Sequence, residues 1–264
     1  MKKTNGGAEG PRTVIHSVHK SLRLLKYIAS AEREVGIAEL QRQFGFSSST
    51  IHHLLQTLML EGFVSQNTAT KKYEIGPEFL YMTMAHKHFE KFFARALPIL
   101  GEIREETGET TILFIQSGVE AVAVLGQESA KTIRARLRIG RKIPLHCTAT
   151  GKTFLAYLPE ETVKNILVVT GLPGYEKNTI TSEEELFAEL ARIRRRGFAF
   201  EFDEYEDMIN ALGFPVFNAE GKIFAAVCVV GPSGRLTGEA MEAMGPGIRS
   251  QVDRISTVLA SPYY

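Results

Sequence analysis

Apolar residues in the first part of the chain recur with the period of a helix. Between residues 17 and 31 they fall three or four positions apart, and a shorter segment at 37–44 repeats the pattern before a glycine. A third helix is expected from the serines at 47–49, which are good N-caps, to about Glu61, with Gly62 ending it. The pattern therefore predicts three short helices before residue 62.

Two short strands are expected directly after these helices. Phe63-Val64 and Tyr73-Glu74-Ile75 are rich in strand-forming residues, and the polar segment 67–70 between them is typical of a turn. Three helices followed by a hairpin are the pattern of a winged helix-turn-helix. In such a domain the third helix lies in the major groove of DNA.

The polar face of the third helix carries side chains that can hydrogen-bond to phosphates or base edges. These are Ser48, Ser49, Thr50, His52, His53 and Gln56, and Lys71 and Lys72 stand at the end of the expected wing turn. We therefore expect these residues to bind DNA, although a plain three-helix subdomain with a solvated polar face would share the pattern. A metal site at the histidine pair is not expected, because adjacent helical residues point about 100° apart and no further ligand motif accompanies them.

The rest of the chain mixes helical and strand patterns without repeats. A further helix is expected at 77–93, as a linker packed against a neighbour or a second subunit. Helices are then expected at 96–108, after 148, at 160–168, 182–196 and 238–260, and strands at 110–118, 120–129, 198–202, 212–217 and 222–230. This order predicts an α+β fold with a mostly antiparallel sheet.

One segment of this second region carries a row of arginines. In residues 132–140 apolar and basic residues alternate, which predicts a strand with Arg134, Arg136 and Arg138 on one face. We favour the interpretation that this face is solvated. The alternative is that the arginines attract an anionic ligand.

Composition is that of a soluble globular protein. The chain has 264 residues, 44% hydrophobic and 23% charged, which suits one large or two modest domains. No apolar run reaches about 18 residues, so no membrane span is expected. The first 13 residues lack the apolar core of a signal peptide, so we interpret them as a disordered leader of a cytoplasmic protein.

Charge is distributed unevenly along the chain. Residues 1–76 hold ten Lys and Arg against six Asp and Glu, whereas the remaining residues hold 21 against 24. A basic first part and a mildly acidic second part suggest that only the first part meets a polyanion.

The sequence contains no motif for catalysis or for a cofactor. Cys147 and Cys228 form no spacing motif and are expected to be buried, unreactive thiols. His146 and Cys147 are adjacent, which rarely brings an imidazole into contact with a thiol, and no third orienting group is evident. We therefore expect neither an enzyme nor a bound metal or cofactor.

Several stretches in a fixed order carry a family resemblance. These include SVHKSLRLLKYI, SSSTIHHLLQTLMLEGFV, KKYEIGPEFL, ETGETTILFI and, as the most diagnostic, PLHCTATGKTFLA. In this order the chain resembles the IclR family of bacterial transcription regulators. The resemblance implies a winged helix-turn-helix at 14–76 and a GAF-like effector-binding and oligomerisation domain at 94–264, on either side of the linker helix expected at 77–93 and after the leader at 1–13. It also implies a homodimer or homotetramer on a palindromic double-stranded DNA operator.

The chain departs from the family pattern at several positions. His53 stands where the family commonly has arginine, and a neutral imidazole is a weaker phosphate anchor than a guanidinium. The family's effector-pocket positions correspond here to Ala149, Thr150 and Gly151 at a helix start, to Glu201 or Asp203, and to Met208, Ala211, Cys228 and Val230.

These substitutions predict a less polar pocket. Family members that take small oxo-acids usually have a cysteine in place of Ala211 and serines in place of Cys228 and Val230, and a family glycine is replaced by Met208. An apolar lining favours apolar ligand surface, so we expect a larger, aromatic carboxylate as effector. We expect its carboxylate at the N–H groups of the helix start. The alternative is a constitutive DNA-binding protein whose second domain only oligomerises.

Overall fold

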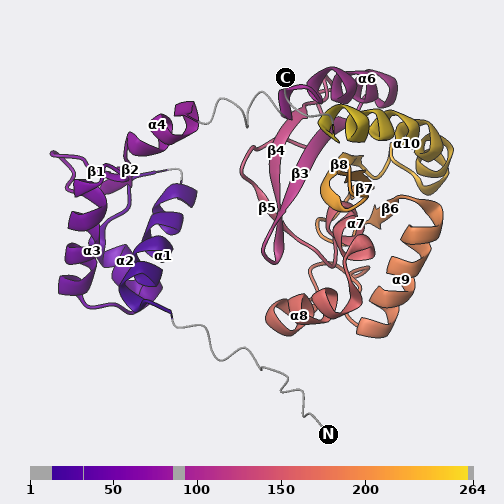
Figure 1. The fold of residues 1–264 in the computed structure, drawn as a ribbon. Coiled ribbons are helices and arrows are strands. Elements are labelled where there is room, and N and C mark those ends of the chain that lie inside the picture. Colours follow the sequence, from indigo (N-terminus) through magenta and orange to yellow (C-terminus); the bar gives the residue numbers. More distant parts are fainter. Residues whose placement is uncertain (1–13, 32, 86–92, 261–264) are drawn as a thin grey trace, which may run out of the picture. The chain divides into compact units, whose positions relative to one another are not determined.

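The computed structural model describes residues 14–31, 33–85 and 93–260. The chain divides into two compact units, residues 1–87 and 88–264, which Figure 1 draws with their helices and strands labelled. The predicted leader at 1–13 and the last part of the predicted linker helix, 86–92, lie outside the described residues.

The first unit has the predicted elements in the predicted order. They are α1 (His16–Ser30), α2 (Ile37–Phe44), α3 (Ser48–Leu60), β1 (Val64–Gln66), β2 (Tyr73–Ile75) and α4 (Glu78–Ala85). Gly45 ends α2 in the left-handed conformation, with φ of 67°. Ser47 then caps α3, because its hydroxyl accepts a hydrogen bond from the Thr50 N–H at 3.2 Å. The turn between the two helices is therefore specified by local sequence.

The wing and the start of α4 are both fixed to the helical core. Val35 and Tyr73 exchange two backbone hydrogen bonds of 2.8 and 2.9 Å, which attach β2 to the connection between α1 and α2. The Phe63 and Phe79 rings meet edge to face with centroids 5.4 Å apart. The described part of the predicted linker helix therefore begins as an integral part of the winged helix.

The second unit is built on a six-stranded sheet in the order β5-β4-β3-β8-β7-β6, and each neighbouring pair is antiparallel. The strands are β3 (Thr110–Ser117), β4 (Glu120–Gln127), β5 (Lys142–Pro144), β6 (Ala199–Phe202), β7 (Ile209–Phe217) and β8 (Ile223–Pro232). Strand β8, close to the end of the chain, pairs with β3 and so joins the early strands to the late ones.

Helices cover both faces of this sheet (Figure 1). They are α6 (Leu97–Thr107), α7 (Ala149–Tyr157), α8 (Glu160–Thr170), α9 (Glu183–Arg196) and α10 (Gly238–Ala260). Alternate strand residues face opposite sides: Leu113 and Val227 pack with α6 and α10, whereas Ile112 and Cys228 pack with α7, α8 and α9. The α+β fold predicted from the sequence is thus confirmed. Within the residues that the structure describes, no helix is both long and apolar enough to cross a membrane.

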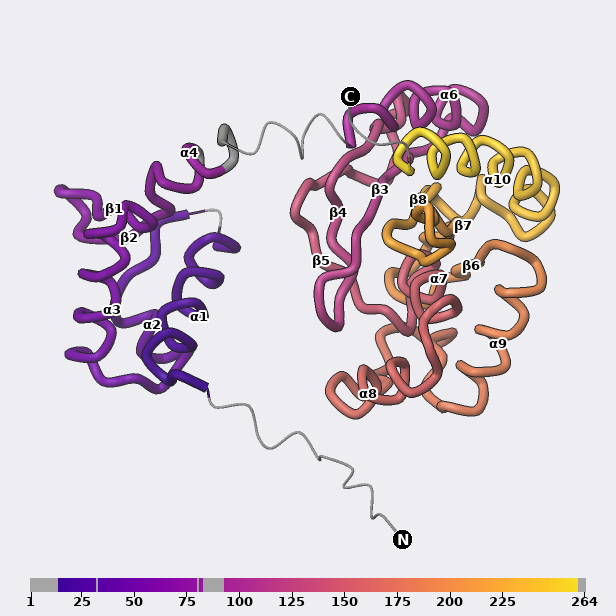
Figure 2. The backbone as a smooth tube through the Cα atoms, viewed as in Figure 1, coloured from indigo at the N-terminus to yellow at the C-terminus, as the bar shows by residue number. Residues whose placement is uncertain are grey.

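The strand predicted at 132–140 is wrong. This segment is a loop between β4 and β5, whose backbone can be followed in Figure 2, and Ile133 and Ile139 are 71% and 61% exposed. On the side of β4 away from β3, β5 pairs with residues 120–122, and the Gly140 N–H donates to the Ala123 carbonyl at 2.8 Å, so the segment leads into β5 as a loop. The loop is held by side chains instead, because Glu128 accepts hydrogen bonds from Arg134 Nε at 2.5 Å and from the Leu137 N–H at 3.0 Å.

Candidate DNA-binding face and ligand cavity

Helix α3 separates its core residues from its polar residues. Ile51, Leu55 and Leu58 are buried in the first unit. The exposed residues include Ser48, Ser49, His52, His53 and Gln56 of the predicted DNA-binding set. Thr50 is half-buried, and its hydroxyl lies 2.8 Å from that of Ser47 in the cap. Thr50 therefore stabilises the start of α3. The other five side chains are exposed, and the hydroxyl of Ser49 also lies 3.1 Å from that of Ser47.

The wing turn is shaped by a residue that the sequence interpretation missed. Glu34, in the connection between α1 and α2, accepts hydrogen bonds from Asn67 Nδ2 at 2.5 Å and from Thr70 Oγ1 at 2.7 Å. These bonds hold the pKa of Glu34 below its usual range. Lys71 takes a left-handed conformation with φ of 58°, and the turn leaves Lys71 and Lys72 exposed at its end. The contact joins residues more than 30 positions apart, so no local sequence pattern could have predicted it.

The second unit contains a cavity of about 460 Å³. It lies on the sheet face that packs with α7, between strands β3, β7 and β8 and the loop that follows β4. Its buried lining includes Ile112, Phe114, Thr148, Thr150, Glu201, Ala211 and Cys228, and its outer lining includes Arg134, Arg136, Arg138, Arg141, Tyr205 and Glu206. The cavity therefore has an apolar interior with a few polar groups and a charged rim.

Five of the nine predicted effector residues line this cavity. They are Thr150, Glu201, Ala211, Cys228 and Val230. They come from α7, β6, β7 and β8, and the antiparallel register sets Ala211 opposite both Glu201 and Val230. Three of the four substitutions that predicted a less polar pocket, at Ala211, Cys228 and Val230, thus lie on the wall of one cavity.

The structure places two of the remaining four at the start of α7 but not on the cavity wall. The Ala149 N–H donates to Glu201 Oε2 at 2.9 Å, and the Gly151 N–H donates to the capping hydroxyl of Thr148 at 3.0 Å. A Cβ atom at Gly151 would lie 2.3 Å from the Cα atom of Leu145. Gly151 therefore lets α7 pack closely against the backbone, and the two N–H groups are already bonded within the protein.

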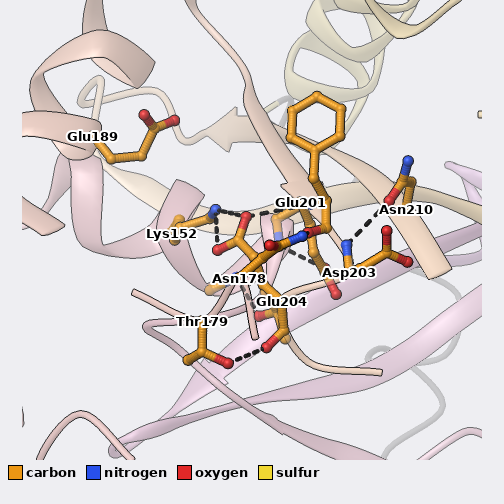
Figure 3. A network of polar contacts seen from close by, with 12 residues as sticks. Lys152, Asn178, Thr179, Glu189, Glu201, Asp203, Glu204 and Asn210 are labelled. Atoms are coloured by element: carbon orange, nitrogen blue, oxygen red, sulfur yellow. Dashed lines mark hydrogen bonds and ion pairs between the residues drawn. The ribbon is translucent and has the colours of Figure 1, made fainter. Parts of the chain in front are cut away.

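The other two residues lie in the turn between β6 and β7 and do not line the cavity. Met208 is 68% exposed, with φ of 60°. Asp203 also has positive φ, and its N–H donates to Asn210 Oδ1 at 3.1 Å, a bond drawn in Figure 3. Both residues shape the turn, and the adjacent Tyr205 and Glu206 contribute to the cavity rim instead.

A buried polar network lies next to Glu201, which is a residue of the cavity wall (Figure 3). Lys152 Nζ donates to the two carboxylate oxygens of Glu204 at 2.5 and 2.6 Å, and both side chains are almost fully buried. Glu201 lies nearby, and burial raises its pKa to about 8, although the Ala149 N–H and the Lys152 ammonium oppose this shift. Glu201 is therefore mostly protonated at neutral pH, whereas Lys152 has its own carboxylate partner.

The favoured sequence interpretation placed three of the rim arginines on a solvated strand face, and the structure does not. Arg134, Arg136 and Arg138 are exposed, yet all three line the cavity and do not form the solvated face of a strand. Arg141, which the sequence interpretation did not single out, forms an ion pair with Glu206 across the rim. The alternation of arginines was the available signal, and the alternative interpretation of an anionic ligand agrees with their position.

The geometry at His146 and Cys147 does not suit nucleophilic catalysis. Burial raises the pKa of the Cys147 thiol to about 12, so the thiol stays protonated. The imidazole of His146 is engaged elsewhere, because Nε2 lies 3.0 Å from the carbonyl oxygen of Pro173. Among the described residues, no three His, Cys, Asp or Glu side chains are grouped as a metal site would require.

A winged helix with an exposed polar recognition helix, joined to a second domain of different architecture, is the organisation of a DNA-binding transcriptional regulator. Residues 17–68 match the IclR helix-turn-helix domain, and residues 86–257 match the C-terminal domain of the bacterial transcriptional regulator IclR. The chain belongs to the IclR family.

Known proteins support this assignment. The transcriptional repressor IclR of Escherichia coli (strain K12) is 32% identical over 233 residues, covering 88% of this chain and 85% of that protein. The crystal structure of an IclR transcriptional regulator from Alicyclobacillus acidocaldarius has a TM-score of 0.80 at 25% identity, covering 94% of this chain and 100% of that chain. An IclR homolog from Microbacterium hydrocarbonoxydans, solved with 4-hydroxybenzoate, has a TM-score of 0.78 at 21% identity, covering 92% of this chain and 98% of that chain. The first two relatives are regulators rather than enzymes.

Proposed function

We propose that this regulator binds a specific operator, and that a small organic acid with a sizeable apolar part modulates this binding from the second unit. The observation that carries the proposal is the cavity of about 460 Å³. Its volume is in the range of small-molecule sites, and its apolar walls with a few polar groups are the usual lining of such sites.

On the DNA side, α3 is the recognition helix of the proposal. Ser48, Ser49, His52, His53 and Gln56 would contact base edges and phosphates, and Thr50 would hold the helix start. Lys71 and Lys72 of the wing would contact the DNA backbone. A homodimer or tetramer on a palindromic operator would place two such helices one helical turn of DNA apart.

Coupling between ligand and operator would pass through the linker at 77–93. Its first part, α4, is packed on the wing through Phe79 and Phe63, and the Glu78 N–H donates to the Gly62 carbonyl at 3.1 Å. A change in the direction of α4 therefore turns the whole winged helix with it. Because half-site spacing is a strict geometric requirement, a small reorientation changes operator affinity.

The experiment combines ligand binding with operator binding. The full chain is heated with pyruvate, glyoxylate, benzoate, 4-hydroxybenzoate, phenylacetate and medium-chain acids, and 4-hydroxybenzoate is included because one structural neighbour was solved with it. A ligand at about 100 times its Kd should add roughly 2.7 kcal/mol to the free energy of unfolding. The same acid should shift affinity for an operator selected in vitro from random duplexes.

A cavity-filling variant provides the control. Ala211→Leu, at a fully buried position on the cavity wall, should abolish stabilisation by the acid, provided that its melting temperature without ligand shows that it folds. Stabilisation by no acid, together with unchanged operator affinity, would favour a constitutive DNA-binding protein whose second unit only oligomerises.

A further inference from the structure

Among the described residues, the inner end of the cavity offers no unpaired cationic side chain to a carboxylate. Of the first three N–H groups of α7, those of Ala149 and Gly151 are bonded to Glu201 and Thr148. Burial keeps the Glu201 carboxyl and the Cys228 thiol protonated at neutral pH, since their pKa values are raised to about 8 and about 12. The nearby Lys152 is paired with a carboxylate of its own. The inner end is therefore neutral.

One polar side chain at this inner end lacks a good partner. Thr150 is 1% exposed and lines the cavity, and within the described residues no nitrogen or oxygen atom hydrogen-bonds to its Oγ1. Its neighbour is the thiol of Cys228, and a thiol is a weak hydrogen-bonding group. A buried hydroxyl with only a weak partner is incompletely satisfied, so this position suits a ligand atom that can donate or accept a hydrogen bond.

The rim carries the positive charge. Four arginines lie there, and two of them are paired, Arg134 with Glu128 and Arg141 with Glu206. Across the described part of the chain, the side chains of Arg136 and Arg138 have no hydrogen bond or ion pair. Arg136 lies near enough to Glu128 to help lower the pKa of that carboxyl, but neither arginine forms an ion pair with it. An anionic group at the rim would therefore find two guanidinium groups whose N–H donors are not bonded to a carboxylate, and Arg binds carboxylates in a fixed planar geometry.

We propose that the effector is an acid with its carboxylate at one end and a neutral hydroxyl group at the other, bound with the carboxylate at Arg136 and Arg138 and the hydroxyl at Thr150 and Glu201. This inference rests on the proposed function and specifies the ligand class of the same cavity. It reverses the orientation expected from the sequence, in which the carboxylate binds the start of α7. The apolar walls, which include Phe114 and Val230, contact the body of the ligand.

The test is calorimetric titration of the full chain with three matched probes: 4-hydroxybenzoate, benzoate, and the uncharged 4-hydroxybenzamide. The double variant Arg136→Gln/Arg138→Gln should weaken the binding of both carboxylates about tenfold to a hundredfold, as expected for charge-assisted hydrogen bonds. It should leave the affinity for 4-hydroxybenzamide within about twofold. Arg195→Gln removes another exposed arginine, on α9, and should leave all three affinities unchanged.

The hydroxyl end is tested at Thr150. Thr150→Val keeps the shape of the side chain but removes the hydroxyl, so it should weaken 4-hydroxybenzoate about threefold to tenfold and leave benzoate unchanged. Thr150→Ser should restore the wild-type preference for the hydroxylated acid. The ratio of the two acids' affinities is the readout, because loss of folding would affect both acids equally.

Three results would overturn the proposal, and they differ in what they imply for the proposed function. If the arginine variant binds both carboxylates like wild type while Thr150→Val weakens benzoate, the carboxylate binds at α7, and the proposed function stands. If wild type binds pyruvate or glyoxylate and none of the three probes, the effector is a small oxo-acid, and the proposed function again stands. If no acid binds, the proposed function fails as well.

Discussion

Replacing Glu201 by Gln should change how the stability of the second unit depends on pH. The side chain is 5% exposed, and burial raises its pKa from 4.5 to about 8. Between these two values the folded protein keeps a proton that the unfolded chain releases, so the contribution of Glu201 to stability falls as pH rises from 4.5 to 8. Gln has nearly the same shape and can still accept the Ala149 hydrogen bond, but it does not titrate.

The magnitude follows from the two pKa values. Relative to a group that does not titrate, Glu201 costs about 2 kcal/mol at pH 6 and about 5 kcal/mol at pH 9. Wild type should therefore lose about 3 kcal/mol relative to Glu201→Gln between these pH values. Lys152, Glu204, Glu206 and the thiol of Cys228 lie close to Glu201. They are present in both proteins, so their own titrations largely cancel in the difference.

The two cysteines make the second unit measurable by itself. Cys147 and Cys228 are free and buried, and both lie in this unit, whereas the chain has no tryptophan for fluorescence. Protein equilibrated in urea at pH 6 or pH 9 is exposed briefly to a thiol reagent at one fixed pH, and the labelled fraction gives the free energy of unfolding. Glu184→Gln, which changes an exposed carboxylate on α9, is the control and should show no such difference. If wild type and Glu201→Gln differ by the same amount at pH 6 and pH 9, Glu201 does not keep its proton in the folded state, and the reasoning is refuted.

Three further predictions concern packing and the DNA-binding unit. Gly151→Ala should lower the free energy of unfolding by about 1–3 kcal/mol in the same thiol assay, because its Cβ would lie 2.3 Å from a backbone atom of Leu145; an unchanged value would show that α7 shifts freely. Lys71→Gln/Lys72→Gln should weaken binding to all DNA sequences alike and reduce the slope of log affinity against log salt by about 2; a loss confined to the operator would contradict a phosphate-contact role. Glu34→Ala removes the acceptor for the wing turn, so trypsin should cleave after the wing lysines faster than in wild type, and equal rates would show that the turn holds without it.

The elements of the winged helix could be predicted because their signals are local. Helical spacing, the serine cap at Ser47 and the glycine at Gly45 each specify a few neighbouring residues, and the structure uses them as expected. Five strands of the six-stranded sheet could be predicted for the same reason, whereas the short strand β5 was not expected. The strand order of the sheet could not be predicted, because the pairing of β8 with β3 depends on residues more than 100 positions apart.

The cavity could be predicted only in part. Family positions located Thr150, Glu201 and Ala211 on its wall, but the hydrogen bond from the Ala149 N–H to Glu201 joins residues 52 positions apart. That bond changes the chemistry of the helix start, because an N–H group expected to bind a ligand is already used within the protein. The first N–H groups of a helix have no partner within the helix, and the sequence indicates which residues these are. Which side chain bonds to them depends on the tertiary fold.

The arginine row illustrates the same limit. Alternation at 132–140 is a real local pattern, yet a strand also needs regular backbone pairing with a neighbour. In the described residues this segment has one backbone hydrogen bond to β4, from the Gly140 N–H to the Ala123 carbonyl. Without a neighbouring strand the segment becomes a loop, and its arginines line the rim of the cavity instead of a solvated sheet face. The positive charge at the cavity rim therefore depends on this segment being a loop and not a strand. In the proposed complex, that charge favours an acid bound with its carboxylate outward. The titration of the Arg136→Gln/Arg138→Gln variant therefore also tests whether the arginines of this loop serve to bind the ligand.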